Sequence, residues 1–338
     1  MAREDTVSFR SLLKCKYFYV ENYICISTFL QKVFRQCLYS VQNTGIHFRF
    51  QEDPMTATDA KTIHTLDLMA VKIRKHIIEM LYHAKSGHPG GSLSAADALV
   101  SLYFKHMNHD PKKPNDPERD RFILSKGHAA PALYAVLAES GYFSVNELNK
   151  LRTINCMLQG HPVCLYTPGV EASTGSLGHG LSFASGVALA GKLDKRSYHV
   201  YVMLGDGETD EGQIWEAAAA ASHYKLDNLI AMIDRNYLQI DGNTEEVLRL
   251  ESIRDRWSSF GWHVIEVDGH NIRDILSALE EASNHKNQPS ILILDTVKGK
   301  GVSFMENNVD FHGVPPNEME YKLAMEELSL LEKKLGVE

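Results

Sequence analysis

The sequence predicts an α/β protein with a doubly wound, mainly parallel sheet and helices on both faces. Two short apolar runs rich in β-forming residues, 198–204 and 229–233, flank an Ala-rich helical segment at 213–224. Such a strand–helix–strand unit requires parallel neighbouring strands joined by a right-handed crossover. Strand and helix patterns go on alternating after this unit, which is typical of a doubly wound sheet.

Periodicity and capping residues predict the other elements. Apolar residues recur at spacings of three and four from Thr62, which predicts a helix that ends at the SGHPGG run of residues 86–91. Ser94 is predicted to cap the next helix, which runs to about His106. The remaining predicted strands are 121–124, 263–267 and 290–297, and the remaining predicted helices begin at Ser144 or span 181–193, 253–260, 272–282 and 318–335.

Composition limits the class of protein. A chain of 338 residues can bury a large core, and its net charge of −8, with both signs mixed, does not favour nucleic acid or an anionic membrane surface as a partner. No stretch approaches the roughly 20 apolar residues of a membrane span. The five cysteines have no metal-type spacing, and an odd number without a signal peptide fits a reducing compartment. We therefore expect a cytoplasmic protein.

The first 54 residues differ from the rest. They hold three of the five cysteines and many aromatic residues, without a clean helical or strand period. We expect residues 1–54 to be an extension, either disordered or an over-extended start, and residues 55–338 to form the domain. A docking arm for a partner or membrane is the alternative interpretation of this segment.

Candidate ligand-binding residues follow the two strands of the central unit. Gly205-Asp206-Gly207 follows the first strand and Asp234-Arg235-Asn236 the second, and ligands of open α/β sheets bind at such carboxyl ends. Oxygens of Asp206, Asn236 and a backbone carbonyl, for which Leu238 is placed, suit Mg²⁺ on a phosphorylated ligand. Gly207 would let the backbone approach the phosphates. A glycine-flanked aspartate in a simple turn is the alternative.

A second glycine-rich loop, STGSLGHG at residues 173–180, precedes the predicted helix 181–193. Its small residues leave backbone N–H groups accessible at a helix N-terminus, where phosphate groups bind favourably.

These motifs together resemble those of transketolases. Asn236 lies 30 positions after Asp206, as in the thiamine diphosphate motif. Four segments are similar to transketolase sequence motifs: GDGETDEGQIWEA, SGHPGG, SKGHA and STGSLGHG. The GHP of residues 160–162 and the HG-x-P histidine at residue 312 add to the resemblance. It covers about residues 62–336 and implies the pyrophosphate domain of the thiamine-diphosphate-binding fold.

The resemblance assigns roles to individual residues. Asp206, Asn236 and Leu238 would hold Mg²⁺, with Ca²⁺ as a possible substitute. His88, His161 and His312 would face the sugars, where an imidazole with a pKa near neutrality can handle hydroxyl protons. The implied contacts of the cofactor thiamine diphosphate are His128, Gly175, Ser176, Leu177, Gly207, Glu211, Asn236 and His312.

Two acidic and three basic side chains have open interpretations. In transketolases, acids matching Glu211 and Glu216 join a chain across the subunit interface, but carboxylates early in a helix commonly just offset its dipole. Lys126 is expected to be a solvated cation. Lys298 and Lys300 follow the last strand and could approach an anionic ligand, although loop lysines are usually solvated.

The resemblance ends where a full transketolase continues into its pyrimidine-binding domain. It therefore implies the N-terminal subunit of a two-subunit transketolase, which forms an α2β2 heterotetramer with a separate C-terminal partner subunit. Such an enzyme moves a two-carbon ketol unit from a ketose phosphate to an aldose phosphate, as in the pentose phosphate pathway. The alternatives are a 1-deoxyxylulose-5-phosphate synthase-like or 2-oxo-acid dehydrogenase E1-like subunit, or a non-catalytic scaffold. SGHPGG and SKGHA favour transketolase, and the intact Asp206 and Asn236 argue against a scaffold.

Overall fold

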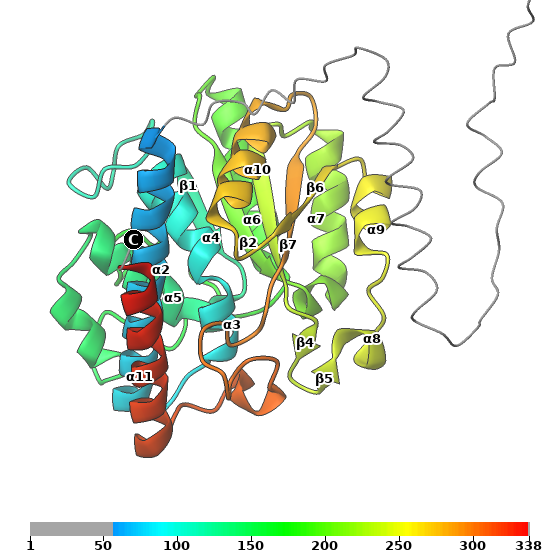
Figure 1. The fold of residues 1–338 in the computed structure, drawn as a ribbon. Coiled ribbons are helices and arrows are strands. Elements are labelled where there is room, and N and C mark those ends of the chain that lie inside the picture. The colour runs from blue at the N-terminus through cyan, green and yellow to red at the C-terminus, as the bar shows by residue number, and fades with distance from the viewer. Residues whose placement is uncertain (1–56, 337–338) are drawn as a thin grey trace, which may run out of the picture. The chain divides into compact units, whose positions relative to one another are not determined.

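Five parallel strands form the central sheet of the computed structural model, which describes residues 57–336 (Figure 1). The prediction for residues 1–54 lies outside the described residues. The strands run in the order β1-β2-β3-β7-β6. Their bounds are Arg121–Leu124 for β1, Val200–Gly205 for β2, Leu229–Arg235 for β3, His263–Asp268 for β6 and Ser290–Asp295 for β7.

Alternating side chains of the strands face two separate cores. Val202 of β2 packs in one core and Met203 in the other, and both are fully buried. The first core is completed by α6 (His179–Leu193), α7 (Gly212–His223) and α9 (Ile253–Ser259). The second contains residues of α2 (Ala57–Ala84), α4 (Ala96–Ser101), α5 (Ala130–Ser140), α10 (Ile272–Asn284) and α11 (Glu318–Leu335). The doubly wound parallel sheet with helices on both faces is thus confirmed.

Helices α2 and α11 lie side by side on one of these faces (Figure 1). The rings of Tyr82 and Tyr321 stack between them with centroids 4.2 Å apart. No helix within residues 57–336 is long and apolar enough to cross a membrane.

The segment after α2 differs from its prediction. Its helix starts earlier, as α3 (Gly90–Ser94), and continues through α4 and the π-helical turn η2 (Leu102–His106). Ser94 is buried inside α3, and its hydroxyl donates to Asp234 Oδ2 at 2.7 Å. The predicted cap was therefore wrong, because a distant carboxylate takes this hydroxyl.

Short elements connect the larger ones. Ser144 does cap a helix, since its hydroxyl accepts from the Asn146 amide at 3.3 Å, but that helix is the short 3₁₀ segment η4 (Val145–Lys150). The other short elements are η3 (Gly127–Ala129), η5 (Gly207–Asp210), η6 (Val309–His312), α8 (Thr244–Val247) and the hairpin of β4 (Leu238–Gln239) and β5 (Gly242–Asn243).

The register of the sheet brings the polar strand ends together. Gly205 of β2 pairs with Asp234 of β3, which in turn pairs with Leu294 of β7. The turns after β1, β2, β3 and β7 consequently meet at one edge of the sheet. This confirms the expected convergence of the GDG and DRN motifs.

Candidate functional site

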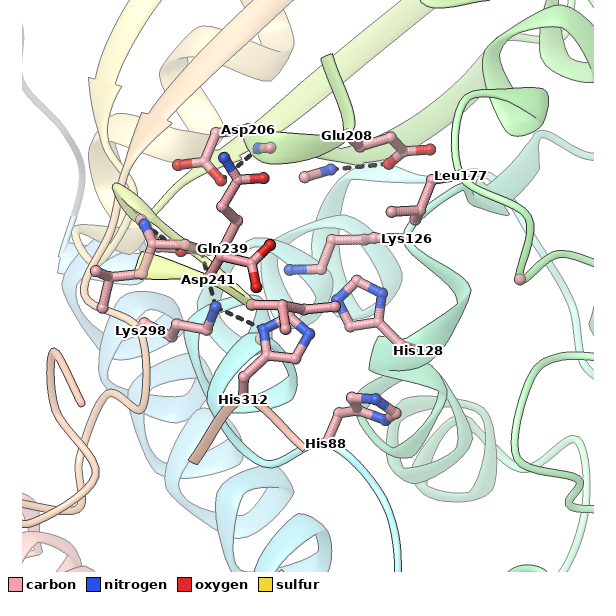
Figure 2. A pocket seen from close by; sticks show the side chains of 17 residues that line it. His88, Lys126, His128, Leu177, Asp206, Glu208, Gln239, Asp241, Lys298 and His312 are labelled. Carbon is pink, nitrogen blue, oxygen red and sulfur yellow. Dashed lines mark hydrogen bonds between the residues drawn. The ribbon is translucent and has the colours of Figure 1, made fainter. Parts of the chain in front are cut away.

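A cavity of about 280 Å³ opens at this carboxyl edge (Figure 2). Segments from across the chain contribute to its walls, including the SGHPGG loop, the four strand-end turns and the loop around residue 312. The lining residues are His88, Gly91, Lys126, His128, Gly175, Leu177, Gly205, Asp206, Gly207, Glu208, Asn236, Leu238, Gln239, Ile240, Asp241, Lys298 and His312.

Most of the predicted site residues meet in this cavity. His88, His128, Gly175, Leu177, Gly207, His312 and all three expected metal ligands line it. His161, Ser176 and Glu211 do not line it. Ser176 and Glu211 are exposed, and Glu216 lines a different cavity, between α6 and α7.

Three oxygen-bearing groups lie at the ends of β2 and β3. Asp206 is 2% exposed; its Oδ1 accepts from the Gly207 amide at 2.8 Å and its Oδ2 from the Tyr237 amide at 2.7 Å. Asn236 is 4% exposed, and its Oδ1 accepts from the Leu238 amide at 3.2 Å. The Leu238 carbonyl also borders the cavity and accepts from Lys298 Nζ at 2.8 Å.

These groups form an oxygen donor set with a single carboxylate. Burial, together with the nearby charge of Asp234, raises the pKa of Asp206 above its ordinary value. Within the described residues, no group of three or more His, Cys, Asp or Glu side chains is placed to hold a metal ion. One carboxylate, one amide and one carbonyl suit a hard cation that takes its remaining ligands from phosphate and water.

Three imidazoles form a triangle at the other end of the cavity (Figure 2). The ring centroids lie 5.3 Å apart for His88 and His128, 5.5 Å for His88 and His312, and 5.3 Å for His128 and His312. Burial, with neighbouring cations, lowers the pKa of His88 to about 4 and that of His312 to about 3. Burial and Lys126 hold the pKa of His128 well below its ordinary value. All three are therefore neutral at pH 7.

Two lysines supply the positive charge that the histidines lack. Lys126 is 1% exposed and forms an ion pair with Asp234, so the expectation of a solvated cation was wrong. Lys298 is 2% exposed and donates to the Leu238 carbonyl and, at 2.8 Å, to Nδ1 of His312. Burial lowers the pKa of Lys298 to about 8. Of the two possibilities left open for Lys298, the structure favours the site role, whereas Lys300 does not line the cavity.

Glu208 is a site residue that the sequence analysis missed. It is 2% exposed and accepts hydrogen bonds from the amides of Gly178 and Gly205, both at 2.9 Å, and from the Ser125 hydroxyl. Its burial raises the pKa of the carboxyl group above its ordinary value. Glu208 thus ties together the loops that follow β1 and β2 and the one that precedes α6. The only signal in the sequence was its place directly after the GDG motif.

Glycines allow two of these loops to touch. A Cβ on Gly127 would lie 2.8 Å from the Gly175 amide nitrogen, closer than real Cβ atoms come to other atoms. Gly175 itself has a φ of 151°, in the region that favours glycine. The SKGHA turn and the STGSLGHG loop are therefore held in backbone contact.

Two buried polar atoms in residues lining the cavity have no hydrogen-bond partner among the described residues. They are Nδ1 of His88 and Nε2 of Gln239. Buried polar atoms are almost always paired, so an unpaired one at a cavity indicates a ligand or solvent that satisfies it. The Gln239 amide group is a donor that suits an anionic oxygen. With two lysines, this chemistry fits the diphosphate of thiamine diphosphate.

Comparisons with known proteins agree with this geometry. Residues 66–337 match the family model of the transketolase thiamine diphosphate binding domain. An apulose-4-phosphate transketolase subunit of Phocaeicola vulgatus is 47% identical over 276 residues, which cover 82% of this chain and 98% of that protein. A 6-deoxy-6-sulfo-D-fructose transketolase subunit of a Clostridium strain is 48% identical over 256 residues, which cover 76% of this chain and 93% of that protein.

Single-chain transketolases match over a smaller part of their length. Human transketolase is 42% identical over 278 residues, which cover 82% of this chain and 44% of that protein. The solved structure of Campylobacter jejuni transketolase superimposes with a TM-score of 0.74 at 30% identity, over 80% of this chain and 45% of that one. The chain belongs to the transketolase family, whose thiamine diphosphate binding domain it contains.

Proposed function

We propose that this chain is the N-terminal subunit of a two-subunit transketolase that transfers a two-carbon ketol unit from a ketose phosphate to an aldose phosphate. The observation that carries the proposal is the joint placement of Asp206, Asn236 and the Leu238 carbonyl with two buried lysines at one cavity. Two relatives that this chain covers over 98% and 93% of their length are named as transketolase subunits, which supports a separate C-terminal partner. We extend this to an α2β2 assembly in the cytoplasm.

Asp206, Asn236 and Leu238 would hold Mg²⁺. Their oxygens are one anionic and two neutral, and phosphate oxygens together with water would supply the remaining ligands. Ca²⁺, which accepts oxygen ligands with a looser geometry, is the expected substitute. Gly207, which has no Cβ, would allow the diphosphate to approach the backbone. A Cβ at this position would also crowd the Gln239 side chain, at 3.0 Å.

Lys126, Lys298 and the Gln239 amide would bind the anionic end of thiamine diphosphate, with His128 as a neutral donor beside them. The cofactor, when bound, supplies the carbanion chemistry that breaks and forms carbon–carbon bonds. The chain contributes charge, position and proton handling. Gly175 and Leu177 complete the wall on the side of the STGSLGHG loop; Ser176 and Glu211 are proposed contacts only by their match to the family motif.

The histidines would exchange hydrogen bonds and protons with the sugar hydroxyls. Lys298 Nζ donates to Nδ1 of His312, so the neutral ring of His312 carries its proton on Nε2 and can donate there. His88 has a free buried Nδ1 at the same cavity. His161 lies outside the cavity lining, and we keep it as a contact of the more distant part of the substrate.

The sugar pair is set mainly by the partner subunit. The same two relatives are named for apulose 4-phosphate and 6-deoxy-6-sulfo-D-fructose, so the subunit form serves more than one sugar. We propose phosphorylated sugars for this chain, including those of the pentose phosphate pathway. The carbonyl-bearing carbons would face His88 and His312, whatever group the far end of the sugar carries.

The test is a coupled ketol-transfer assay with xylulose 5-phosphate, ribose 5-phosphate, thiamine diphosphate and Mg²⁺. We expect activity only when this chain is mixed with its candidate C-terminal partner, and loss of activity in Asp206→Ala. Asp227→Ala is the matched control, because that carboxylate pairs with Lys192 on the surface, before β3 begins. Turnover by this chain alone at an ordinary enzymatic rate contradicts the two-subunit proposal. Cofactor binding by the mixture without turnover redirects it to another sugar or to one of the other thiamine diphosphate enzymes.

A further inference from the structure

We propose that Asp234 is a positioning residue that fixes the Asn236 amide and the Lys126 ammonium for the cation and the diphosphate. The proposal rests on the proposed function, since it concerns the same cavity. Asp234 does not line that cavity itself and acts through its neighbours.

The Asp234 carboxylate joins segments from four parts of the chain. It is 1% exposed. Its Oδ2 accepts from the Ser94 hydroxyl at 2.7 Å, from Asn236 Nδ2 at 2.9 Å and from Lys126 Nζ, while its Oδ1 accepts from the Thr296 hydroxyl at 2.5 Å. These donors come from α3 and from the turns after β1, β3 and β7. One buried carboxylate therefore connects all these segments.

This carboxylate also determines which atom Asn236 presents. An ionised carboxylate only accepts hydrogen bonds, so the Asn236 atom facing Asp234 must be the amide nitrogen. The amide oxygen then points the other way, where it accepts from the Leu238 amide and keeps a second lone pair. A hard cation binds oxygen and not an amide NH₂ group. Two longer hydrogen bonds favour the same orientation, one from the Leu238 amide to Asn236 Oδ1 at 3.2 Å and one from Asn236 Nδ2 to the Asp234 backbone carbonyl at 3.4 Å. The carboxylate adds the shortest of the three contacts that hold this amide.

The same carboxylate holds Lys126. An unpaired ammonium at 1% exposure would be strongly disfavoured, and Asp234 is its ion-pair partner. Figure 2 shows the side chain of Lys126 pointing into the cavity, which it lines.

The first variant is Asp234→Asn, tested in the full chain with its partner subunit. We expect the Mg²⁺ dissociation constant, measured by calorimetry at saturating thiamine diphosphate, to rise 10–100-fold, as is typical when a group that orients a metal ligand is lost. Thr296→Val is the control. It removes only the bond to Oδ1 and leaves Asn236 Nδ2 on Oδ2, so the Mg²⁺ affinity should stay within about threefold of the wild type.

A swap of the two residues separates orientation from simple structural support. Asn236→Asp alone puts two carboxylates against each other and should weaken Mg²⁺ binding. Asp234→Asn combined with Asn236→Asp restores a donor facing an acceptor and again directs an oxygen at the cation. Because the new amide nitrogen would also face Lys126 Nζ, these variants are compared in a Lys126→Met background. The Mg²⁺ affinity of the swapped pair should return to within about tenfold of Lys126→Met alone.

The outcomes are distinct. If Asp234→Asn keeps its circular dichroism and binds Mg²⁺ like the wild type, the inference is overturned while the proposed function stands. If Asp234→Asn does not fold, the comparison of Asn236→Asp with the swapped pair in the Lys126→Met background decides, and binding by a folded swapped pair that is as weak as that of Asn236→Asp overturns the inference. If the wild type shows no Mg²⁺-dependent binding of thiamine diphosphate, the proposed function and the inference fail together.

Discussion

Lys298 gives the clearest quantitative consequence of the site. It is an ammonium at 2% exposure whose pKa burial lowers to about 8 from 10.5. At about 1.36 kcal/mol per pKa unit, keeping it charged in the folded chain costs about 3 kcal/mol at neutral pH. The free energy of unfolding of the cofactor-free domain should therefore be larger at a pH at which Lys298 is neutral in the folded chain. Under the proposed function, the diphosphate of the cofactor would offset this cost.

This effect predicts the direction in which the free energy of unfolding changes with pH. Between pH 8 and 10.5 the unfolded chain holds a proton on Lys298 that the folded chain has released, so stability from this group rises with pH. Below pH 8 both states are protonated and the cost is fully present. From pH 7 to pH 9 the free energy of unfolding of the wild type should gain about 1 kcal/mol relative to Lys298→Met.

Urea unfolding followed by tryptophan fluorescence measures this difference, because the three tryptophans of the chain, Trp215, Trp257 and Trp262, pack together in one core. Lys298→Met also loses two hydrogen bonds, which shifts its stability equally at every pH and leaves the slope interpretable. Lys300→Met, outside the cavity, should keep the wild-type slope. Equal slopes for the wild type and Lys298→Met would refute the reasoning.

Three further predictions follow from the cavity walls. Glu208→Gln should lower the free energy of unfolding by about 2 kcal/mol, because a buried charged acceptor shared by two amides and a hydroxyl is lost. A decrease of less than about 0.5 kcal/mol in the free energy of unfolding, measured in urea, would contradict this. Gly127→Ala should displace the Gly175 backbone and weaken thiamine diphosphate binding, measured by calorimetry, at least tenfold. The control is Gly186→Ala, where nothing lies within 4 Å of the added Cβ. It should leave the affinity unchanged and raise the free energy of unfolding by up to about 1 kcal/mol. The affinity for the cofactor, measured against pH, should show no change from the ionisation of His88 between pH 6 and 7.5, because the pKa of His88 is about 4. A titration midpoint near pH 6.5 that disappears in His88→Asn would contradict this prediction.

The central strand–helix–strand unit and its two motifs could be predicted because their chemistry is local. Asp206 and Asn236 follow adjacent parallel strands, so the chain direction alone places them at one edge of the sheet. The glycine-rich loop before α6 was predictable because its small residues and the helix that follows are adjacent in the sequence. Its contacts with Gly127 and Glu208 were not predictable, because those residues lie far from it along the chain.

The roles of Lys126 and Ser94 could not be predicted, because their partner is far away in the sequence. Both donate to Asp234, which lies 108 and 140 residues from them. A loop lysine is solvated unless a tertiary carboxylate draws it inward, and a serine before a helical pattern is a cap unless another acceptor takes its hydroxyl. Glu208 was missed for the opposite reason: an acid early in a helix is usually exposed, and only the three-loop junction buries it.

The most direct test of the account is a calorimetric titration of thiamine diphosphate into the assembled subunits, with and without Mg²⁺. The wild type should bind one cofactor per copy of this chain, and binding should require the divalent cation. Asp206→Asn should lose at least a hundredfold in affinity, because the only carboxylate of the donor set becomes neutral. Cation-independent binding of equal strength by the wild type and Asp206→Asn would contradict the assignment of this cavity as the diphosphate and metal site.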